Sequence, residues 1–548
     1  MAVISLTKFS GVAPRVSPNK LSPDMAQTAS NVRLVAGTLH SWKNTVTVAS
    51  GMTSGAQSTI YRYGQDLYSD SQYWFDFAVD VDVVKGAIAN DQTERTYFTH
   101  PSIGARITNN SLALTGGSTG YPRNSYPLGV PAPTGTPVAA VTVVGDTSSS
   151  LETRVYVFTF VTSLGEEGPP SLVSNFINAR TVGSTVQLTG LGTTAPTNYG
   201  GYITAKRIYR TLSGSLSTEY QLVDEIPISQ ASYNDFILGS ALDEVIPSVT
   251  WAPPPTGSFG ITQMANGIML VFKGYDIYPS EAFIPYAYPA NYSMSVDYPI
   301  VGGAAIGTSA IIATTGHPYL LTGSDPSALS LVKLEAPQSC SSKRSMAVVS
   351  GGVMYASPDG LIFVSVTGQV QNVTESLFSR DEWQLLVPTS MHGYFHDGRY
   401  YGFYNTGAVQ RGFIYDPAQG SGAFTFIDTY ATAGYSDLLQ DALYLKIGTN
   451  IVKWHADSTR MSYTWRSAIF EMGSPMNPAC AQVVAKTYPA TFKLYADGTL
   501  KHTQTVANVE PFWLPSGYKA RYLEVEISGT AEVLSVHVAS SPQELKGV

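Results

Sequence analysis

The chain has 548 residues, which predicts roughly three to four domains because a single core does not grow that large. Hydrophobic residues make up 44% and charged residues only 13%, while Gly (49), Pro (33) and Tyr (34) are abundant, so the sequence predicts an all-β fold of short strands and tight turns. The net charge of −8 argues against tight nucleic-acid binding, although a passage through which DNA slides would need that weak attraction to phosphate.

The low content of charged residues and the two cysteines give information about the cellular compartment in which the protein folds. A surface with few charges suits a protein that buries much of itself against copies or partners, and a secreted β protein is the alternative. Cys340 and Cys480 are far apart and predict two buried, small apolar residues without a disulfide framework, as in the reduced cytosol. The first residues, MAVISLTKFSGVAPR, have no charged leader followed by an apolar segment, so we expect no secretory signal.

The N-terminal arm is predicted to span residues 1–45. Three prolines keep its first part extended, and Ser22 followed by Pro-Asp predicts the N-cap of a short helix that runs through Ala29. The segment 31–39 then predicts strand, turn and strand around Gly37. Such an arm is expected to lie along another domain or subunit, with a frayed terminus as the alternative.

Residues 46–128 and 256–458 share one pattern. The first contains the aromatic-rich runs IYRYG, QYWFDFAVDVDVV and RTYFT, and the second contains strand-turn-strand units at intervals of about thirty-five to fifty residues. Asp359-Gly360 and Asp397-Gly398 are two of the predicted hairpin turns. Self-similar units of this size resemble the blades of a β-propeller, so both segments are predicted to form one propeller, whose blade count stays open.

A separate module is predicted at residues 129–255, between the linkers PLGVPAPTGTP and WAPPPTGSFG. Its short, regular strands predict a small sandwich inserted into the propeller. The strand from Val155 to Phe160, the Glu-Gly-Pro-Pro turn at Glu167 and the strand around Ile208 resemble a fibronectin type III domain.

One long stretch, residues 298–321, contains no charged residue and could be mistaken for a membrane span. Paired glycines, Thr-Thr-Gly and His-Pro interrupt it. The stretch therefore predicts strands and turns.

The C-terminal region, residues 459–548, is predicted to be a β platform domain. Asp497-Gly498 predicts a tight hairpin, and the Pro-Ser-Gly sequence at 515–517 predicts a second turn. Apolar and polar residues then alternate: Leu523, Val525 and Ile527 are interleaved with Glu524, Glu526 and Ser528. This alternation predicts a strand with one apolar face and one solvated face.

Few residues have the spacing of a metal site. His392 and His396, followed by Asp397, are predicted to lie in a strand and hairpin, where positions i and i+4 are about 13 Å apart, so a metal pair is disfavoured. Another acidic run lacks the glycine and the terminal glutamate of a calcium loop and predicts a solvated strand face instead. Its members are Asp76, Asp80 and Asp82.

Candidates for acid–base chemistry are two adjacent carboxylate pairs, Glu166-Glu167 and Asp224-Glu225. Neighbours in a strand point to opposite faces, so neither pair is expected to act on one bond, although propeller glycosidases assemble carboxylates from separate blades. The sequence has neither a Gly-x-Ser-x-Gly elbow nor a phosphate-binding loop. We therefore expect no enzyme, no cofactor, and no catalytic, cofactor-binding or metal-binding residue.

The basic residues do not gather into a patch. The densest pair, Lys343-Arg344, predicts an ordinary loop charge. Core packing is favoured over carbohydrate stacking for the aromatic residues Tyr73, Trp74, Trp465 and Trp513.

The two ends of the chain resemble the tail nozzle (tail tubular protein B-like) proteins of short-tailed bacteriophages. The resemblance is carried by FSGVAPRVSPNKLSPDMAQTASNVRLVAGTL at the front and by YTWRSAIF, FKLYADGT and LPSGYKARYLEVEISGT at the back. It implies structural and no catalytic roles for the matching positions. These are Pro14, Arg15, Ala26, Asn31, Gly37, Leu39, Trp465, Arg466, Tyr495, Asp497, Gly498, Leu514, Pro515, Gly517, Tyr518 and Glu524.

The resemblance implies a structural virion protein of the phage tail, made in the host cytoplasm. It implies a homohexameric ring below the portal and the adaptor, or head-to-tail connector, with contacts to tail fibres or spikes. Double-stranded DNA would pass through the ring without sequence-specific binding, and no membrane span is implied. The alternatives are a receptor- or glycan-binding tail protein (adhesin) and a propeller glycan hydrolase.

Overall fold

The computed structural model describes residues 4–53, 55–64, 73–88, 91–116, 120–212 and 219–545. The protein is all-β, as its composition predicts, and is built from many small antiparallel sheets. Within the described residues, the two α-helices, α1 (Asn110–Leu114) and α2 (Arg380–Gln384), are each five residues long and do not cover a sheet.

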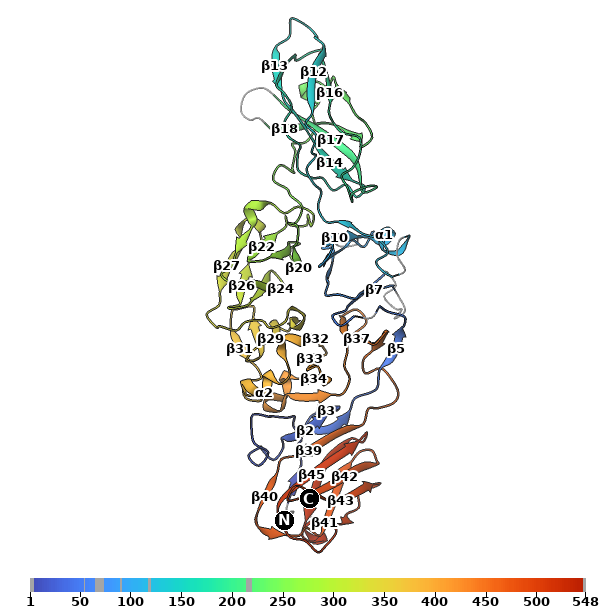
Figure 1. The fold of residues 1–548 in the computed structure, drawn as a ribbon, viewed down its shortest axis with the longest axis vertical. Coiled ribbons are helices and arrows are strands. Elements are labelled where there is room, and N and C mark those ends of the chain that lie inside the picture. Colours follow the sequence, from blue (N-terminus) through green and yellow to red (C-terminus); the bar gives the residue numbers. More distant parts are fainter. Residues whose placement is uncertain are drawn as a thin grey trace.

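Figure 1 shows three tiers along the long axis of the molecule, with both termini in the lowest one. The upper tier, residues 129–255, is called the insert. The middle tier, residues 46–128 and 256–458, is called the body. The lower tier, called the platform, combines residues 4–45 with residues 459–545.

The body consists of small antiparallel sheets whose strands follow one another in sequence. These strands are β6 (Thr59–Tyr63), β7 (Tyr73–Phe77), β8 (Asp82–Lys85), β9 (Thr96–His100), β10 (Gly104–Thr108), β11 (Tyr126–Pro127), β20 (Phe259–Gln263), β21 (Met269–Lys273), β22 (Asp276–Pro279), β23 (Met294–Ser295), β24 (Ile300–Ile306), β25 (Ser309–Thr314), β26 (Tyr319–Thr322), β27 (Ser330–Lys333), β28 (Ala347–Val349), β29 (Gly352–Ser357), β30 (Gly360–Ser365), β31 (Val370–Asn372), β32 (His392–His396), β33 (Arg399–Asn405), β34 (Gln410–Tyr415), β35 (Phe424–Ile427), β36 (Ala433–Asp437), β37 (Ala442–Ile447) and β38 (Asn450–Lys453).

The first strands of these sheets contact one another in a fixed order. β8 contacts β20, which contacts β24, and the series continues through β28, β32 and β36 to β6. Phe77, at the end of β7, packs against Phe98 of β9 with ring centroids 5.4 Å apart and so brings the last sheet beside the first. The sheets therefore follow one another around a common centre, in a propeller-like arrangement.

One sheet of the body is completed by a strand from the other end of the sequence. β5 (Val46–Ala49) pairs antiparallel with β38, next to β36 and β37. The strand that leaves the N-terminal arm thus completes the sheet of β36 to β38. Closure of the circle therefore depends on residues about four hundred positions apart in sequence.

Hairpin turns form in the body at the turn residues that the sequence predicts. Asp397 and Gly398, between β32 and β33, have φ values of 48° and 71°, the left-handed pair that a two-residue turn requires. The charge-free stretch 298–321 forms β24, β25 and part of β26, as the sequence predicts. Within the described residues, no helix has the length and hydropathy needed to cross a bilayer.

Within its described residues, the insert is formed by two three-stranded sheets and a two-stranded ribbon. Its core includes Tyr156, Phe158, Val186, Leu188 and Ile208, which are all fully buried. The strands are β12 (Val138–Val143), β13 (Leu151–Arg154), β14 (Tyr156–Thr162), β15 (Ile177–Arg180), β16 (Thr185–Thr189), β17 (Ile203–Thr211), β18 (Tyr220–Pro227) and β19 (Tyr233–Asp235).

The platform is built from both ends of the chain. Its strands are β1 (Ile4–Leu6), β2 (Ala26–Ser30), β3 (Val32–Val35), β4 (Thr38–Ser41), β39 (Tyr463–Ser467), β40 (Phe470–Met476), β41 (Cys480–Ala485), β42 (Ala490–Ala496), β43 (Thr499–Val506), β44 (Phe512–Trp513), β45 (Ala520–Gly529) and β46 (Val533–Ala539). One sheet combines β1, β3 and β4 with β41, β44 and β46. The other runs β2-β39-β45-β42-β43, and β40 also pairs with β45.

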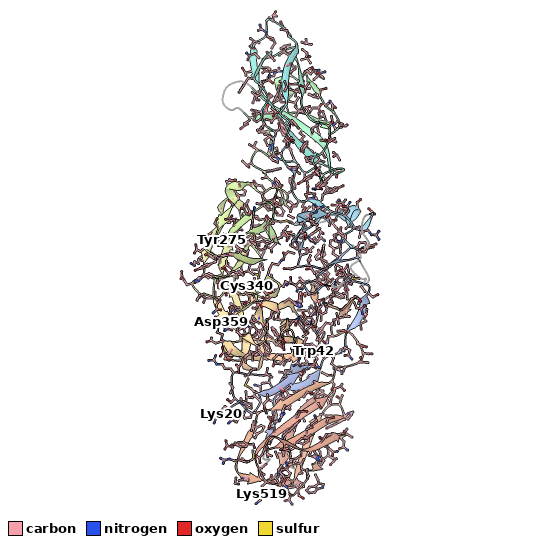
Figure 2. The ribbon with its side chains drawn as sticks, in the orientation of Figure 1. Lys20, Trp42, Tyr275, Cys340, Asp359 and Lys519 are labelled. Atoms are coloured by element: carbon pink, nitrogen blue, oxygen red, sulfur yellow. The ribbon has the colours of Figure 1, made fainter. Side chains whose placement is uncertain are left out.

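β2 joins this second sheet to the body. It pairs antiparallel with β39 on one side and parallel with β35 on the other, so one ten-stranded sheet runs from the body into the platform. Trp42, labelled in Figure 2 where the two tiers meet, packs against Trp454 with ring centroids 5.7 Å apart. The two tiers are thus joined by hydrogen bonds and by aromatic packing.

The helix predicted from Ser22 through Ala29 is wrong, because Ala26–Ser30 is the strand β2. Ser22 donates to Asp24 instead of capping a helix, and pairing with β35 and β39 outweighs local helix propensity. The strand, turn and strand around Gly37 are as predicted, with left-handed φ values of 50° and 79° at Ala36 and Gly37.

The predicted solvated face of β45 is also wrong. Glu524 and Glu526 are buried, although they alternate with the fully buried Leu523, Val525 and Ile527. Arg466 Nη2 lies 2.8 Å from Glu524 Oε2, and Lys493 Nζ lies 2.7 Å from Glu526 Oε1. Cations from the neighbouring strands β39 and β42 cover this face, so it is polar but not solvated.

Two tryptophans of the platform provide a matched test of its packing. Trp465 is fully buried, donates from Nε1 to Ser10 O over 2.9 Å and packs edge-on against Phe9, whereas Trp513 is 68% exposed. Substitution W465A should lower the free energy of unfolding by about 3 to 5 kcal/mol, because it removes a core side chain.

The matched variant W513A should change stability by at most about 0.5 kcal/mol. Chemical denaturation followed by circular dichroism measures both changes. Equal effects of the two substitutions would contradict this account of the platform.

Candidate functional site

The body contains a cluster of charged side chains that pair with one another across its sheets. The 3-10 helix η4 (Lys343–Ser345) lies against β24, β29 and β32. Lys343 Nζ lies 3.0 Å from Asp80 Oδ2 and 2.5 Å from Asp82 Oδ2. Burial raises the pKa of Asp82, and the charge of Lys343 opposes that shift. Lys343, Asp80 and Asp82 thus form a partly buried, ion-paired cluster in the body.

The neighbouring Arg344 ties further strands to this cluster. Its Nη2 donates to Ser58 O, just before β6, over 2.7 Å and to Thr432 O, just before β36, over 2.6 Å. Two sequence predictions are corrected here: Lys343-Arg344 is not an ordinary loop charge, and Asp80 and Asp82 do not form a solvated strand face. Both corrections have one cause, because the circular fold brings distant acidic and basic segments together.

The third aspartate of that run, Asp76, is also buried in an ion pair, with Lys446 of β37. Its Oδ2 accepts hydrogen bonds from the backbone and the side chain of Thr53. Within the described residues, no group of three or more His, Cys, Asp and Glu side chains is placed to hold a metal ion.

His392 is buried in the body. Its ring lies 5.3 Å from that of Phe403, and its Nδ1 lies 3.1 Å from the Tyr394 hydroxyl. Burial holds the pKa of His392 well below its usual value, so this side chain is neutral near pH 7. His396 is half-buried at the other end of β32, next to the turn at Asp397.

The adjacent carboxylates Glu166 and Glu167 are both buried and have separate partners. Glu166 accepts a short hydrogen bond from the Tyr202 hydroxyl, and burial raises the pKa of Glu166 to about 7. Glu167 Oε1 accepts from Tyr209 over 2.8 Å, and Oε2 pairs with Arg207 over 3.0 Å. The two carboxylates therefore do not face one substrate.

The two carboxylates of the second pair also have separate partners. Glu225 Oε2 pairs with Arg207 Nε over 2.8 Å, whereas Asp224 Oδ1 accepts from the backbone N–H of its neighbour. Both side chains belong to β18 of the insert. Neither pair thus forms an acid–base couple.

A buried charge cluster in the insert was missed by sequence reasoning. Arg210 Nη1 lies 2.7 Å from Asp235 Oδ2, which also accepts from the Tyr156 hydroxyl over 2.7 Å. Arg154 pairs with Glu152 and lies beside the same aspartate. The sequence did contain a signal for this cluster. Arg154 directly precedes the apolar run VYVFTFVT, and Arg210 lies in the run RIYRT, so both cations are expected to be buried and to need a carboxylate partner.

Both cysteines are buried and free, as predicted. Burial raises the pKa of Cys340 to about 12, so its thiol is protonated and unreactive near pH 7. Figure 2 shows Cys340 inside the body, among the sheets. Of the aromatic candidates, Trp74 and Trp465 are core residues, as predicted, whereas Tyr73 and especially Trp513 are exposed and depart from the prediction.

A cavity of about 1070 Å³ lies where the insert meets the body. Its walls come from four segments: the turn between β9 and β10, the segment around β11, the second linker at residues 253–259, and residues 198–199 of the insert. Sequence reasoning gave no sign of it, because its walls are far apart in sequence.

The two linkers and an aromatic cluster fix this junction. A Cβ added to Gly129 would lie 2.5 Å from Pro253 Cα, so the entering and leaving linkers touch. Tyr126 of the body stacks on Tyr202 of the insert, with centroids 4.4 Å and planes 5° apart. Tyr202 also packs in one buried cluster with the body residues Tyr97 and Tyr288. The insert is therefore packed against the body as well as linked to it.

The residues that carry the resemblance to nozzle proteins form contacts between the chain ends. Arg466 lies over the ring of Tyr495 at 4.0 Å and pairs with Glu524, which also accepts from Gln27 over 2.7 Å. Asn31 donates from Nδ2 to Asp428 of the body over 2.8 Å. These contacts are structural, and they join the arm to β39 and β45 and to the body.

The other matching positions lie in the same tier. Arg15 donates from Nη1 to Glu375 O over 2.6 Å, and Leu39 is fully buried in the platform core. Asp497 and Gly498 have φ values of 49° and 74° in the predicted hairpin between β42 and β43. Gly517 also has a positive φ, in the predicted second turn.

No protein-family model matches the chain, and no curated protein matches it. Among solved structures, virginiamycin B lyase from Staphylococcus aureus is 8% identical, with 68% of this chain and 99% of that chain covered and a TM-score of 0.29. The Pan2 WD40 domain of Neurospora crassa is 7% identical, with coverages of 52% and 86% and a TM-score of 0.26. PorZ of Porphyromonas gingivalis is 9% identical, with coverages of 95% and 48% and a TM-score of 0.22. These distant similarities carry no information about function.

The partly buried Lys343 can be tested against an exposed lysine. Substitution K343M should destabilise the protein by roughly 1 to 3 kcal/mol, because it leaves two partly buried carboxylates, Asp80 and Asp82, without their cation. The matched variant K333M breaks the exposed pair with Asp297 and should leave the stability nearly unchanged. Chemical denaturation measures both changes, and equally small effects would contradict a stabilising role for the Lys343 cluster.

Glu166 predicts a pH dependence of stability. Its folded pKa of about 7 lies above the ordinary value of 4.5, so the folded state binds the proton more tightly than the unfolded state does. Stability is therefore favoured below pH 4.5 and lost as the pH rises toward 7, by roughly 3 kcal/mol at most.

The variant E166Q has no charge to bury and can still accept from Tyr202. Its melting temperature should rise relative to the wild type between pH 4.5 and 7 and keep a constant advantage above that range. The exposed substitution E510Q serves as the control. A pH-independent difference between E166Q and the wild type would show that Glu166 is not the group responsible.

Proposed function

We propose that this chain is a structural virion protein that forms the tail nozzle ring of a short-tailed bacteriophage. In this role it is a homohexamer attached below the portal and adaptor, and it conducts genomic DNA during ejection. One observation carries the proposal: the two terminal segments that resemble nozzle proteins are interleaved in one platform, where the matching residues contact each other.

The proposed architecture is a β-propeller with an inserted fibronectin type III-like sandwich and a C-terminal sandwich-like platform. Support for the propeller comes from the circular order of the body sheets and from β5, which completes the sheet of β36 to β38. Support for the sandwich comes from the two three-stranded sheets around one core in the insert.

The ion-paired cluster of the body bears on the path that we propose for DNA. Lys343, Asp80 and Asp82 pair with one another inside the body, so we place DNA between copies of the chain and not through one body. A hexameric ring supplies such a passage. The net charge of −8 would keep phosphate groups from binding to its wall.

Exposed apolar side chains support an assembly role for the insert. Within the described residues, it carries thirteen of the exposed large apolar side chains, against sixteen on the much longer remainder. Contiguous exposed apolar surface marks sites of protein–protein contact, and this enrichment is the reason why we propose such a site on the insert. The thirteen are Val138, Val141, Val143, Val144, Leu151, Leu172, Val173, Phe176, Val182, Phe236, Leu238, Val245 and Val249. Tail fibres or spikes are the proposed partners.

A receptor- or glycan-binding tail protein is the second candidate. The cavity between the insert and the body favours it, because the described walls offer both polar and apolar groups. The two candidates differ in stoichiometry and in geometry. A nozzle requires a closed ring with a channel, and a receptor-binding protein does not.

Electron microscopy of the purified full-length protein, together with native mass spectrometry, tests the proposal. We expect a six-membered ring with a central channel lined by several copies. Added portal-adaptor complex should bind one end of this ring. A protein that stays monomeric alone and in assembled particles would refute the proposal.

A further inference from the structure

The junction cavity has a charge that is unusual for this acidic protein. Arg106 of β10 and His100 at the end of β9 both line it. None of the described residues on its wall is an aspartate or a glutamate. A cavity with a cation and no carboxylate, in a chain with a net charge of −8, favours an anionic ligand.

The hydrogen bonds of Arg106 leave part of its guanidinium free. Nε donates to Ser125 Oγ over 3.1 Å, and Nη2 donates to Ser125 O. Among the described residues, Nη1 has no acceptor and the side chain has no ion-pair partner. Ser125 thus holds the guanidinium in position, and the unpaired end remains for a planar anion such as a carboxylate.

Arg106, His100 and Tyr199 are all half-buried, so the charge of Arg106 is partly desolvated. Burial lowers the pKa of Arg106, and burial together with the charge of Arg106 lowers the pKa of His100. Burial raises the pKa of Tyr199, and Arg106 opposes that shift. The positive charge, the neutral imidazole and the phenol therefore lie close together, where an ion pair would be stronger than in water.

The size and the other walls of the cavity indicate the rest of the ligand. A volume of about 1070 Å³ is far larger than a lone inorganic anion needs and fits a ligand of several rings. Pro253, Pro254 and the ring of Tyr199 offer apolar surface, and the amide groups of Asn124 and Asn198 can bind hydroxyl groups. A saccharide has both apolar ring faces and hydroxyl groups.

We propose that this cavity is a binding site for an acidic saccharide, whose carboxylate pairs with Arg106 while its sugar rings pack against Tyr199 and the proline wall. The site needs both the insert and the body. It is independent of the nozzle proposal, because it requires neither a hexamer nor DNA.

Isothermal titration calorimetry of the full-length protein with tri-galacturonic acid tests the proposal. Its fully methyl-esterified form is the matched ligand, since it keeps the sugar rings and removes the negative charges. The acid should bind at least about tenfold more tightly than the ester. Equal binding of the two, or binding of neither, would overturn the proposal.

Substitutions locate the site. R106Q should weaken binding of the acid by at least about tenfold and leave binding of the ester unchanged, whereas R521Q, which removes an exposed arginine of the platform, should have no effect. If thermal unfolding shows that R106Q does not fold, N198D adds a carboxylate to the part of the wall that the insert supplies and should also weaken binding of the acid. Unchanged affinity in a folded R106Q or N198D would overturn the proposal.

A competition with inorganic phosphate separates the saccharide from a general anion site. Phosphate at millimolar concentration should leave the affinity for tri-galacturonic acid within about twofold. Full displacement of the acid by phosphate would show that the cavity binds small anions and would refute the saccharide assignment.

Discussion

The insertion of β2 between the body and the platform is the interaction on which the rest of the structure depends. This five-residue strand pairs with β35 on one side and with β39 on the other, and so makes two tiers into one sheet. The segments that precede and follow β2 in the sequence are also fixed in place. Phe9, in the preceding segment, packs on Trp465 of the platform, and β5, in the following segment, pairs with β38 of the body. Loss of this strand would expose two sheet edges, one on β35 and one on β39.

Buried ion pairs appear at each level of this assembly, although charged residues make up only 13% of the chain. Lys343 with Asp80 and Asp82 holds the centre of the body, Arg210 with Asp235 lies inside the insert, and Arg466 with Glu524 joins strands of the platform. Desolvation cancels much of the energy of such pairs, so their main effect is on specificity. A sheet shifted by one residue would leave a charge buried and unpaired, which penalises wrong registers.

The sequence predicts features that depend on local chemistry and misses those that depend on long-range contacts. The Asp497-Gly498 hairpin follows from two residues that tolerate left-handed φ values, and it forms as expected. The helix expected near Ala29 is a strand, because its hydrogen-bonding partners lie about four hundred residues away. Glu524 and Lys343 look like surface charges in sequence, and only the fold provides the groups that neutralise them. The junction cavity is unpredictable for the same reason, since its four walls share no sequence pattern.

The junction between the insert and the body brings together a stacked pair of tyrosines, a buried carboxylate and the cavity. The stacked pair of Tyr126 and Tyr202 docks the insert, and the Tyr202 hydroxyl donates to Glu166, a carboxylate whose pKa burial raises to about 7. Ionisation of Glu166 therefore works against the docked arrangement above that pH. The cavity exists only while the insert is docked, because Tyr199 comes from the insert and Arg106 from the body. A ligand that contacts both walls stabilises docking by the free energy with which it binds.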